Sequence, residues 1–139
     1  MYEITVKCPA TIEAMEFCDA FVESIAQFFS IHERESLVLS IHEAIINSIE
    51  AMKQLYGEDH NNTFSLYMRI TEEELMILVI DRANGIPAHE HKKLHVNSLE
   101  DLLLAESGRG LLLIKELMDD MWFEQREDGE HAIGMKMRR

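Results

Sequence analysis

Apolar residues near the start of the chain follow first a strand pattern and then a helix pattern. Residues 3–8 alternate between apolar and polar, which predicts a strand that Pro9 ends. Apolar residues then recur every three or four positions from Met15 to Phe29. This spacing predicts an amphipathic helix of about 17 residues, with Thr11 as its N-cap.

A second helix is predicted by the signals at both of its ends. Ser30 and Glu33 have the spacing of a capping box, which predicts a helix start at Ser30. Gly57 predicts a stop after about Tyr56. Between these ends the helix is apolar around most of its circumference, with a core stripe expected from Val38 to Tyr56.

The middle of the chain predicts two strands of different character. Residues 63–70 alternate, as in a strand with one buried face. Residues 75–80 are apolar throughout, so we expect a strand covered on both faces.

A long polar connector then precedes the last elements. Residues 82–107 have the length and composition of a lid, with a short helix near residues 99–105. A third main helix is predicted at 111–121, and residues 121–125 and 133–137 predict a hairpin around an Asp-Gly turn.

The order of these elements predicts the fold class. We expect one domain over residues 1–139: an α+β, two-layer α/β sandwich with a mixed, mostly antiparallel sheet and helices on one face. A chain of 139 residues fits a single domain.

Charge restricts the partners that the protein can have. Thirteen basic and 26 acidic residues give a net charge of −13, which argues against direct nucleic-acid binding and against anionic membranes. A bound nucleotide stays possible, because local donors and Mg²⁺ can override net charge.

The chain start lacks a signal-peptide pattern and the 2 cysteines form no disulfide framework, so we expect a cytoplasmic protein with free thiols.

A narrow polar band on the second helix is the first candidate for chemistry. A helix that is otherwise apolar is expected to turn such a band toward a cleft. Glu43 and Asn47 lie four positions apart, on the same face. A carboxylate can accept a proton, and a carboxamide oxygen can ligate Mg²⁺. The alternative is an ordinary solvated pair. The band consists of Ser40, Glu43, Asn47, Glu50 and Gln54.

Two glycine-containing segments are further candidates. Asp81 ends a buried strand shortly before Gly85 and could accept a hydrogen bond from a base amino group; the alternative is a plain turn. Gly108, Arg109 and Gly110 lead directly into a helix, where backbone N–H groups and a guanidinium could bind an anion. The alternative is a flexible link, since the segment matches neither a dinucleotide fingerprint nor a P-loop.

Histidines in the connector allow a competing interpretation. His89, His91 and His95 have spacings that could hold zinc on a helix. The zinc-protease order H-E-x-x-H is absent, so a solvated lid near phosphate is the simpler interpretation.

Taken together, three motifs resemble the ATPase superfamily of gyrase B, histidine kinases and MutL. They are Glu43-x-x-x-Asn47, Asp81-x-Ala83-x-Gly85 and Gly108-Arg109-Gly110-Leu111, in this order. Within that superfamily, the stretches LSIHEAIINSIEA, DRANGIP and GRGLLLIKELMDD are most similar to bacterial anti-sigma-factor serine/threonine kinases.

The resemblance implies a role for each motif. The family fold holds ATP and Mg²⁺ under a lid. Glu43 would be the catalytic carboxylate and Asn47 the Mg²⁺ ligand. Asp81 would bind the adenine amino group in a pocket shaped by Gly85, and the segment from Gly108 through Arg109 and Gly110 to Leu111 would cradle the phosphates.

The resemblance also implies partners. Such kinases phosphorylate a serine on a small anti-anti-sigma antagonist and sequester a sigma factor, commonly as homodimers. Two departures leave an alternative open: Ala83 stands where the family usually has glycine, and the segment before the last strand lacks the usual threonine. The alternative is a catalytically weak or inactive module of the same fold that sequesters a protein partner.

Overall fold

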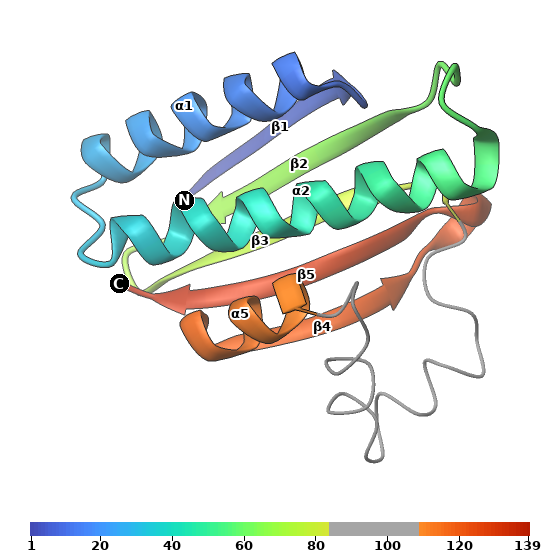
Figure 1. Ribbon diagram of the computed structural model, residues 1–139. Coiled ribbons are helices and arrows are strands. Elements are labelled where there is room, and N and C mark those ends of the chain that lie inside the picture. The colour runs from blue at the N-terminus through green and yellow to red at the C-terminus, as the bar shows by residue number, and fades with distance from the viewer. Residues whose placement is uncertain (84–108) are drawn as a thin grey trace.

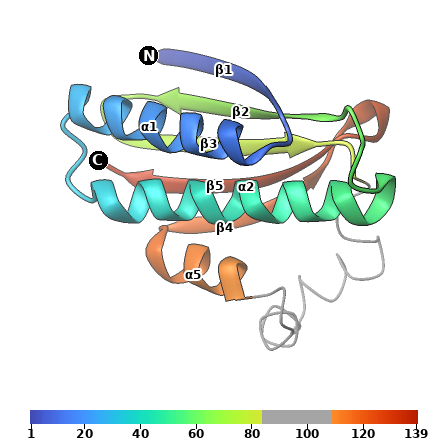
Figure 2. The ribbon, with the colours of Figure 1, turned by 45° about the horizontal axis from the view of Figure 1, so that its top comes forward.

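The computed structural model describes residues 1–83 and 109–139, and in these residues it shows one sheet covered by helices. The strand order is β1-β2-β3-β5-β4, and each of the four neighbouring pairs is antiparallel. The helices all lie on one face of the sheet (Figure 1, Figure 2). The elements are β1 (Tyr2–Pro9), α1 (Ile12–Phe28), α2 (Arg34–Tyr56), β2 (Thr63–Ile70), β3 (Glu74–Asp81), α5 (Arg109–Leu117), β4 (Asp120–Gln125) and β5 (His131–Arg138).

This architecture confirms the predicted α+β sandwich with helices on one face. The sheet was expected to be mixed and mostly antiparallel, and every pairing between described strands is antiparallel. The expected lid, the short helix inside it and the connector histidines lie outside the described residues, apart from Arg82 and Ala83. No helix in the described ranges is long and apolar enough to cross a membrane.

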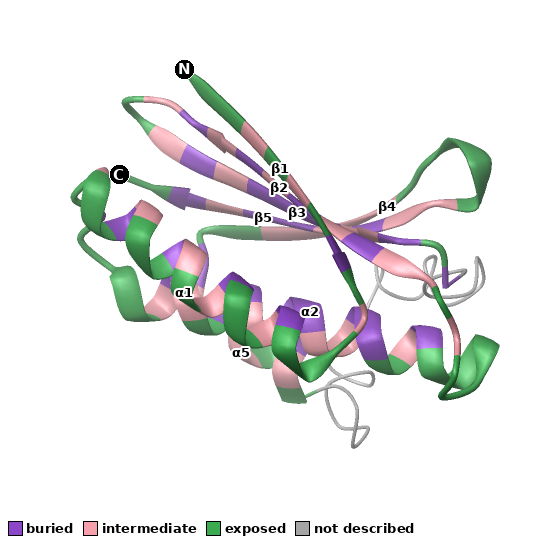
Figure 3. Cartoon of the chain, turned by 90° about the horizontal axis from the view of Figure 1, so that it is seen from above, coloured by how far each residue is buried: buried purple, intermediate pink, exposed green. Residues whose placement is uncertain are grey.

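The core lies between the sheet and the helices, where buried residues concentrate (Figure 3). The alternation predicted for β2 is confirmed, because every second residue from Phe64 to Ile70 is buried. α2 crosses the middle of the layer and packs against α1 on one side and α5 on the other. This central position explains why α2 is apolar around most of its circumference.

The prediction that residues 75–80 are covered on both faces is wrong. Leu75, Ile77 and Val79 face the helices, whereas the alternate residues of β3 face the open side of the sheet. Leu78 is nevertheless buried, because cross-strand neighbours cover it. It pairs with Gly134, which in turn pairs with Trp122. Residues 75–80 are therefore all apolar because Leu78 belongs to an apolar row that crosses the open face of the sheet. No second layer of helices covers that face in the described residues.

The capping box expected at Ser30 is also wrong. Ser30 has φ 54° and ends α1, with its N–H donating to Gln27 O at 3.2 Å and the Ile31 N–H donating to Ala26 O at 2.8 Å. This is the hydrogen-bond pattern of a Schellman motif. Glu33 is the N-cap residue of α2, and its side chain makes no capping hydrogen bond.

Other helix ends agree with the sequence, with small shifts. Thr11 caps α1 by accepting a hydrogen bond from Ala14 N at 3.1 Å, as predicted. Gly57 ends α2 with φ 85°. Tyr56, expected in the core stripe, is exposed. α5 ends at Leu117 rather than at residue 121, because β4 begins at Asp120.

The two cysteines are free, as predicted, and lie together in the core. Cys8 of β1 and Cys18 of α1 have their Sγ atoms 3.9 Å apart. Burial raises the pKa of Cys18 to about 12, so this thiol stays protonated and is a poor nucleophile at neutral pH.

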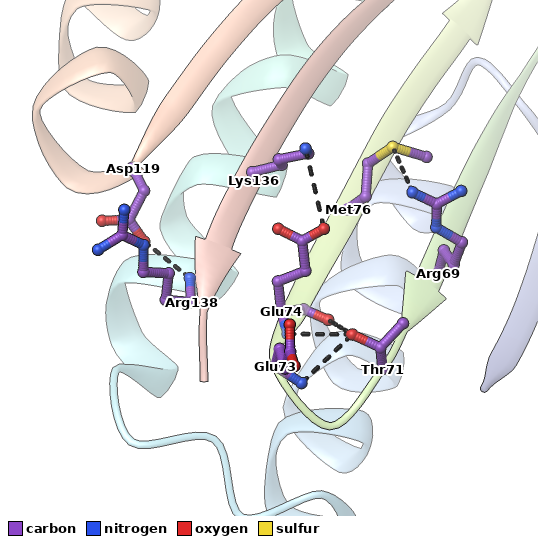
Figure 4. Close-up of polar contacts among 8 residues, drawn as sticks. All are labelled: Arg69, Thr71, Glu73, Glu74, Met76, Asp119, Lys136 and Arg138. Atoms are coloured by element: carbon purple, nitrogen blue, oxygen red, sulfur yellow. Dashed lines mark hydrogen bonds and ion pairs between the residues drawn. The ribbon is translucent and has the colours of Figure 1, made fainter.

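Polar contacts link neighbouring strands and turns at the end of the sheet where β3 begins (Figure 4). Thr71 Oγ1 donates to Glu74 O at 3.2 Å and accepts from Glu74 N at 3.1 Å, which shapes the β2–β3 turn. Asp119 Oδ2 accepts from Arg138 N at 2.7 Å and ties the start of β4 to the end of β5. Asp81 lies at the opposite end of β3, so these contacts are structural and separate from the candidate site.

Candidate functional site

Glu43 and Asn47 are brought together with the start of α5. Both side chains are half-buried on α2. A Cβ atom added to Gly110 would lie 2.5 Å from Glu43 Oε2 and 3.3 Å from Asn47 Nδ2. The first turn of α5 therefore lies close against the carboxylate and the carboxamide, and a residue larger than glycine would require the Glu43 side chain to move.

The orientation of Asn47 favours a ligand on its oxygen. Asn47 Nδ2 donates to the backbone oxygen of Glu43 at 3.0 Å. This bond uses the nitrogen of the carboxamide and leaves Oδ1 as the atom that can ligate a cation.

The start of α5 supplies the donors that an anion needs. Arg109 is the first residue of the helix and is exposed. The N–H groups of the first turn have no partners within the helix, and the dipole adds positive charge there. Leu111 is buried in the core, so only its backbone can contact a ligand. Gly108 lies outside the described residues.

Asp81 is a buried carboxylate at the end of β3. It is only 8% exposed, and its Oδ1 accepts from Ala83 N at 2.9 Å. Burial raises the pKa of Asp81, while the Ser48 hydroxyl, the Ala83 N–H and the charge of His131 act in the opposite direction. A buried carboxylate with a remaining acceptor atom is suited to binding the amino group of a base. Gly85 lies outside the described residues.

Ser48 connects the two halves of the site. It follows Asn47 directly on α2 and is 2% exposed. Its hydroxyl lies close enough to Asp81 to affect the pKa of the carboxyl, yet its Oγ completes no hydrogen bond within the described part of the chain. Such a buried, incompletely bonded hydroxyl fits a site that a ligand completes. Ser48 therefore links the turn of α2 that carries Asn47 to the end of β3 that carries Asp81.

The sequence analysis missed three residues near Asp81. Ser48 interrupts the apolar arc of α2 that faces the sheet, a signal that could have been noticed. His131 pairs with Asp81 across β3 and β5, and its Nδ1 is buried without a partner among described residues. Tyr56 donates from its hydroxyl to Arg82 O at 2.6 Å and so ties the end of α2 to the end of β3.

The donor set fits a nucleotide triphosphate with a hard cation. Carboxylate and amide oxygens suit Mg²⁺, and a glycine at a helix start suits phosphate. No group of three His, Cys, Asp or Glu residues that could hold a metal occurs among the described residues. A cation held by Asn47 would thus depend on phosphate and water oxygens for its other ligands.

Comparison with known proteins identifies the family of the chain. No curated protein sequence matches the chain significantly. A family model described as the histidine kinase-like ATPase domain matches residues 8–137. Because that match covers nearly the whole chain, the protein belongs to the histidine kinase-like ATPase domain family.

Proposed function

We propose that the protein binds ATP with Mg²⁺ and transfers the terminal phosphoryl group to a serine or threonine of a protein antagonist, as anti-sigma-factor kinases do. The observation that carries this proposal is the contact of Gly110 with Glu43 and Asn47. This contact places a general base, a cation ligand and an anion-binding helix start side by side. Family membership supports ATP as the nucleotide.

Each residue has a defined part in this proposal. Asp81 accepts a hydrogen bond from the amino group of the base, and the backbone from Gly108 to Leu111, with Arg109, binds the phosphates. Glu43 accepts the proton of the attacking hydroxyl group. Asn47 holds the Mg²⁺ ion, which neutralises charge on the phosphates when bound. Catalysis of this kind depends mainly on positioning and charge.

The partners follow from the sequence resemblance. The phosphate acceptor is a small anti-anti-sigma antagonist, and a sigma factor is the protein that the kinase sequesters. The net charge of −13 agrees with protein partners rather than with nucleic acid. A cytoplasmic location is consistent with both partners.

The test separates catalysis from binding. Glu43→Ala should lower phosphate transfer from ATP to an anti-anti-sigma acceptor by roughly 100-fold or more, because the general base is lost. ATP affinity should change little. Transfer of labelled phosphate and calorimetric ATP titration measure the two effects. Glu50→Ala is the matched control, since Glu50 lies exposed on the same polar band and should leave both values unchanged. Transfer at the parental rate by Glu43→Ala would refute the role of Glu43.

A second candidate is a module of the same fold that sequesters a partner without turnover. Ala83 favours it: this residue is 6% exposed and its N–H is bonded to Asp81. Its backbone thus lies against the carboxylate that would bind the nucleobase, and it adds a methyl group at a position where the related kinases usually have glycine. Such a module would bind its protein partner equally well with and without ATP.

A further inference from the structure

Two buried polar atoms without hydrogen bonds lie beside Asp81, and the proposed function gives neither of them a role. Among the described residues, three buried side-chain atoms have no hydrogen-bond partner: Ser40 Oγ, Ser48 Oγ and His131 Nδ1. Ser48 and His131 both act on the pKa of Asp81, so two of these three atoms belong to the surroundings of one carboxylate. Buried polar groups in proteins are nearly always bonded, so this concentration indicates a place where a ligand binds.

His131 projects from the same face of the sheet as Asp81. The two residues pair directly across β3 and β5. Directly paired residues share a face, with Cβ atoms about 4.5–5.5 Å apart. Met135 and Met137, which follow His131 on this face of β5, are buried in the core between the sheet and the helices. The imidazole therefore lies beside the carboxylate, on the side of the sheet where α2 carries Ser48.

The surroundings of His131 favour a hydrogen atom on Nδ1. The ring nitrogen that carries the hydrogen in a neutral histidine is set by the groups around the ring. Asp81 is the acceptor beside this imidazole, whereas the neighbouring Glu130 lies 4.0 Å from Arg82 in an ion pair. Asp81 Oδ1 accepts from Ala83 N at 2.9 Å, which leaves Oδ2 as an acceptor. A buried donor and a buried acceptor thus stand side by side at the end of β3.

This pair of groups is complementary to one kind of nucleobase edge. An amino group can donate to Oδ2 of Asp81, and an unprotonated ring nitrogen next to that amino group can accept from Nδ1–H of His131. Adenine has this edge at its amino group and N1. Guanine carries a hydrogen on N1, which would face the hydrogen on Nδ1. Cytosine has an edge equivalent to that of adenine, but family membership favours ATP.

We propose that His131 determines the base specificity of the site: its Nδ1–H donates a hydrogen bond to N1 of adenine, while Asp81 accepts one from the amino group. This inference rests on the proposed binding of ATP and deepens it. Asp81 alone does not select adenine, because a carboxylate can equally accept from the N1–H and amino groups of guanine. His131 supplies the donor that makes the difference, and it takes no part in phosphoryl transfer.

Replacing the ring nitrogen of the ligand tests this contact directly. 1-Deaza-ATP has a C–H group in place of N1 and keeps the amino group. In calorimetric titrations with Mg²⁺, the parent should bind 1-deaza-ATP about 10-fold or more weakly than ATP, because the Nδ1–H donor is left buried without an acceptor. Equal affinity of the parent for the two ligands would overturn the role of His131 and leave the proposed function intact. A folded parent that does not bind ATP would overturn both.

Two variants of His131 separate hydrogen bonding from packing. His131→Leu keeps a branched side chain without a donor, so it should bind ATP and 1-deaza-ATP within about two-fold of each other. His131→Asn places Nδ2 the same number of bonds from the backbone as Nδ1 and should restore the preference for ATP. A preference of parental size in His131→Leu would show that another group contacts N1, and would overturn the proposal. So would a folded His131→Asn that does not prefer ATP. Circular dichroism checks the fold of each variant.

The controls use a second analogue and a second histidine. 7-Deaza-ATP makes the same nitrogen-to-carbon change in the other ring of adenine, so its affinity relative to ATP should be the same in the parent and in His131→Leu. If His131→Leu changed the response to both analogues equally, the effect would be on packing of the whole base, and the contact with N1 would be refuted. His32→Leu makes the same substitution at an exposed position before α2 and should keep the parental preference.

Discussion

Asp81 is a carboxyl group in surroundings that disfavour its charge. Burial raises its pKa, and the Ser48 hydroxyl, the Ala83 N–H and His131 compensate only in part. The folded protein therefore binds the Asp81 proton more tightly than the unfolded chain does. Such a cost is typical of a group retained for binding rather than for stability.

Replacing Asp81 with Asn should reveal this cost as a pH dependence. The folded pKa is raised, so the free energy of unfolding of the parent should fall relative to Asp81→Asn as pH rises from the ordinary carboxyl range through the raised pKa. We expect Asp81→Asn to be at least as stable as the parent at about pH 7, with its advantage shrinking toward about pH 4. Urea unfolding at both values measures this. A variant that is destabilised equally at both would contradict the account.

At the scale of single residues, the sequence predicts contacts within one segment better than contacts between distant segments. The pairing of Glu43 with Asn47 and the cap at Thr11 follow from spacing within one segment, and the structure places both as expected. His131 lies opposite Asp81 only because β3 and β5 pair in one particular register. That register depends on packing between distant segments, so a single sequence does not specify it.

At the scale of elements, the boundary between α1 and α2 shows how a local signal can be overridden. Ser30 and Glu33 match a capping box, yet Ser30 takes a left-handed conformation that lets Ile31 enter the core. Burial of Ile31 contributes more than one side-chain cap would. The hairpin of β4 and β5 shows agreement instead: Asp128 and Gly129 both have positive φ, as its tight turn requires.

The open face of the sheet depends on a glycine in β5. A Cβ atom on Gly134 would collide with the Trp122 indole, so the indole packs directly on the β5 backbone. Gly134→Ala should lower the free energy of unfolding by about 1–3 kcal/mol, because the side chain must move. The protein contains 1 tryptophan, so its emission also reports the displacement.

The control for this prediction removes the collision. In a Trp122→Leu background, Gly134→Ala should cost clearly less than in the parent. An equal cost in both backgrounds, measured by urea unfolding, would show that the indole is not the cause.

For the whole molecule, the order of elements predicted the sandwich because each helix and strand carries its own periodicity. α2 was predicted to be apolar around most of its circumference, and the structure places it between α1 and α5. The convergence of α2, the end of β3 and the start of α5 is a tertiary fact that no periodicity contains. It came instead from the family resemblance that the three motifs carry. The structure brings Glu43 and Asn47 to the start of α5, and it places Ser48, the residue after Asn47, near Asp81.

Calorimetric titration of ATP–Mg²⁺ into the parent and Gly110→Ala tests this convergence most directly. The account predicts parental binding on the order of micromolar and binding at least about 10-fold weaker in Gly110→Ala, whose Cβ would displace Glu43 and crowd Asn47. The variant should stay as stable as the parent, since alanine favours a helix over glycine and Glu43 Oε2 ends a movable side chain. Absence of heat with the folded parent at millimolar ATP–Mg²⁺, or equal affinity in the two proteins, would contradict a single nucleotide site formed by these segments.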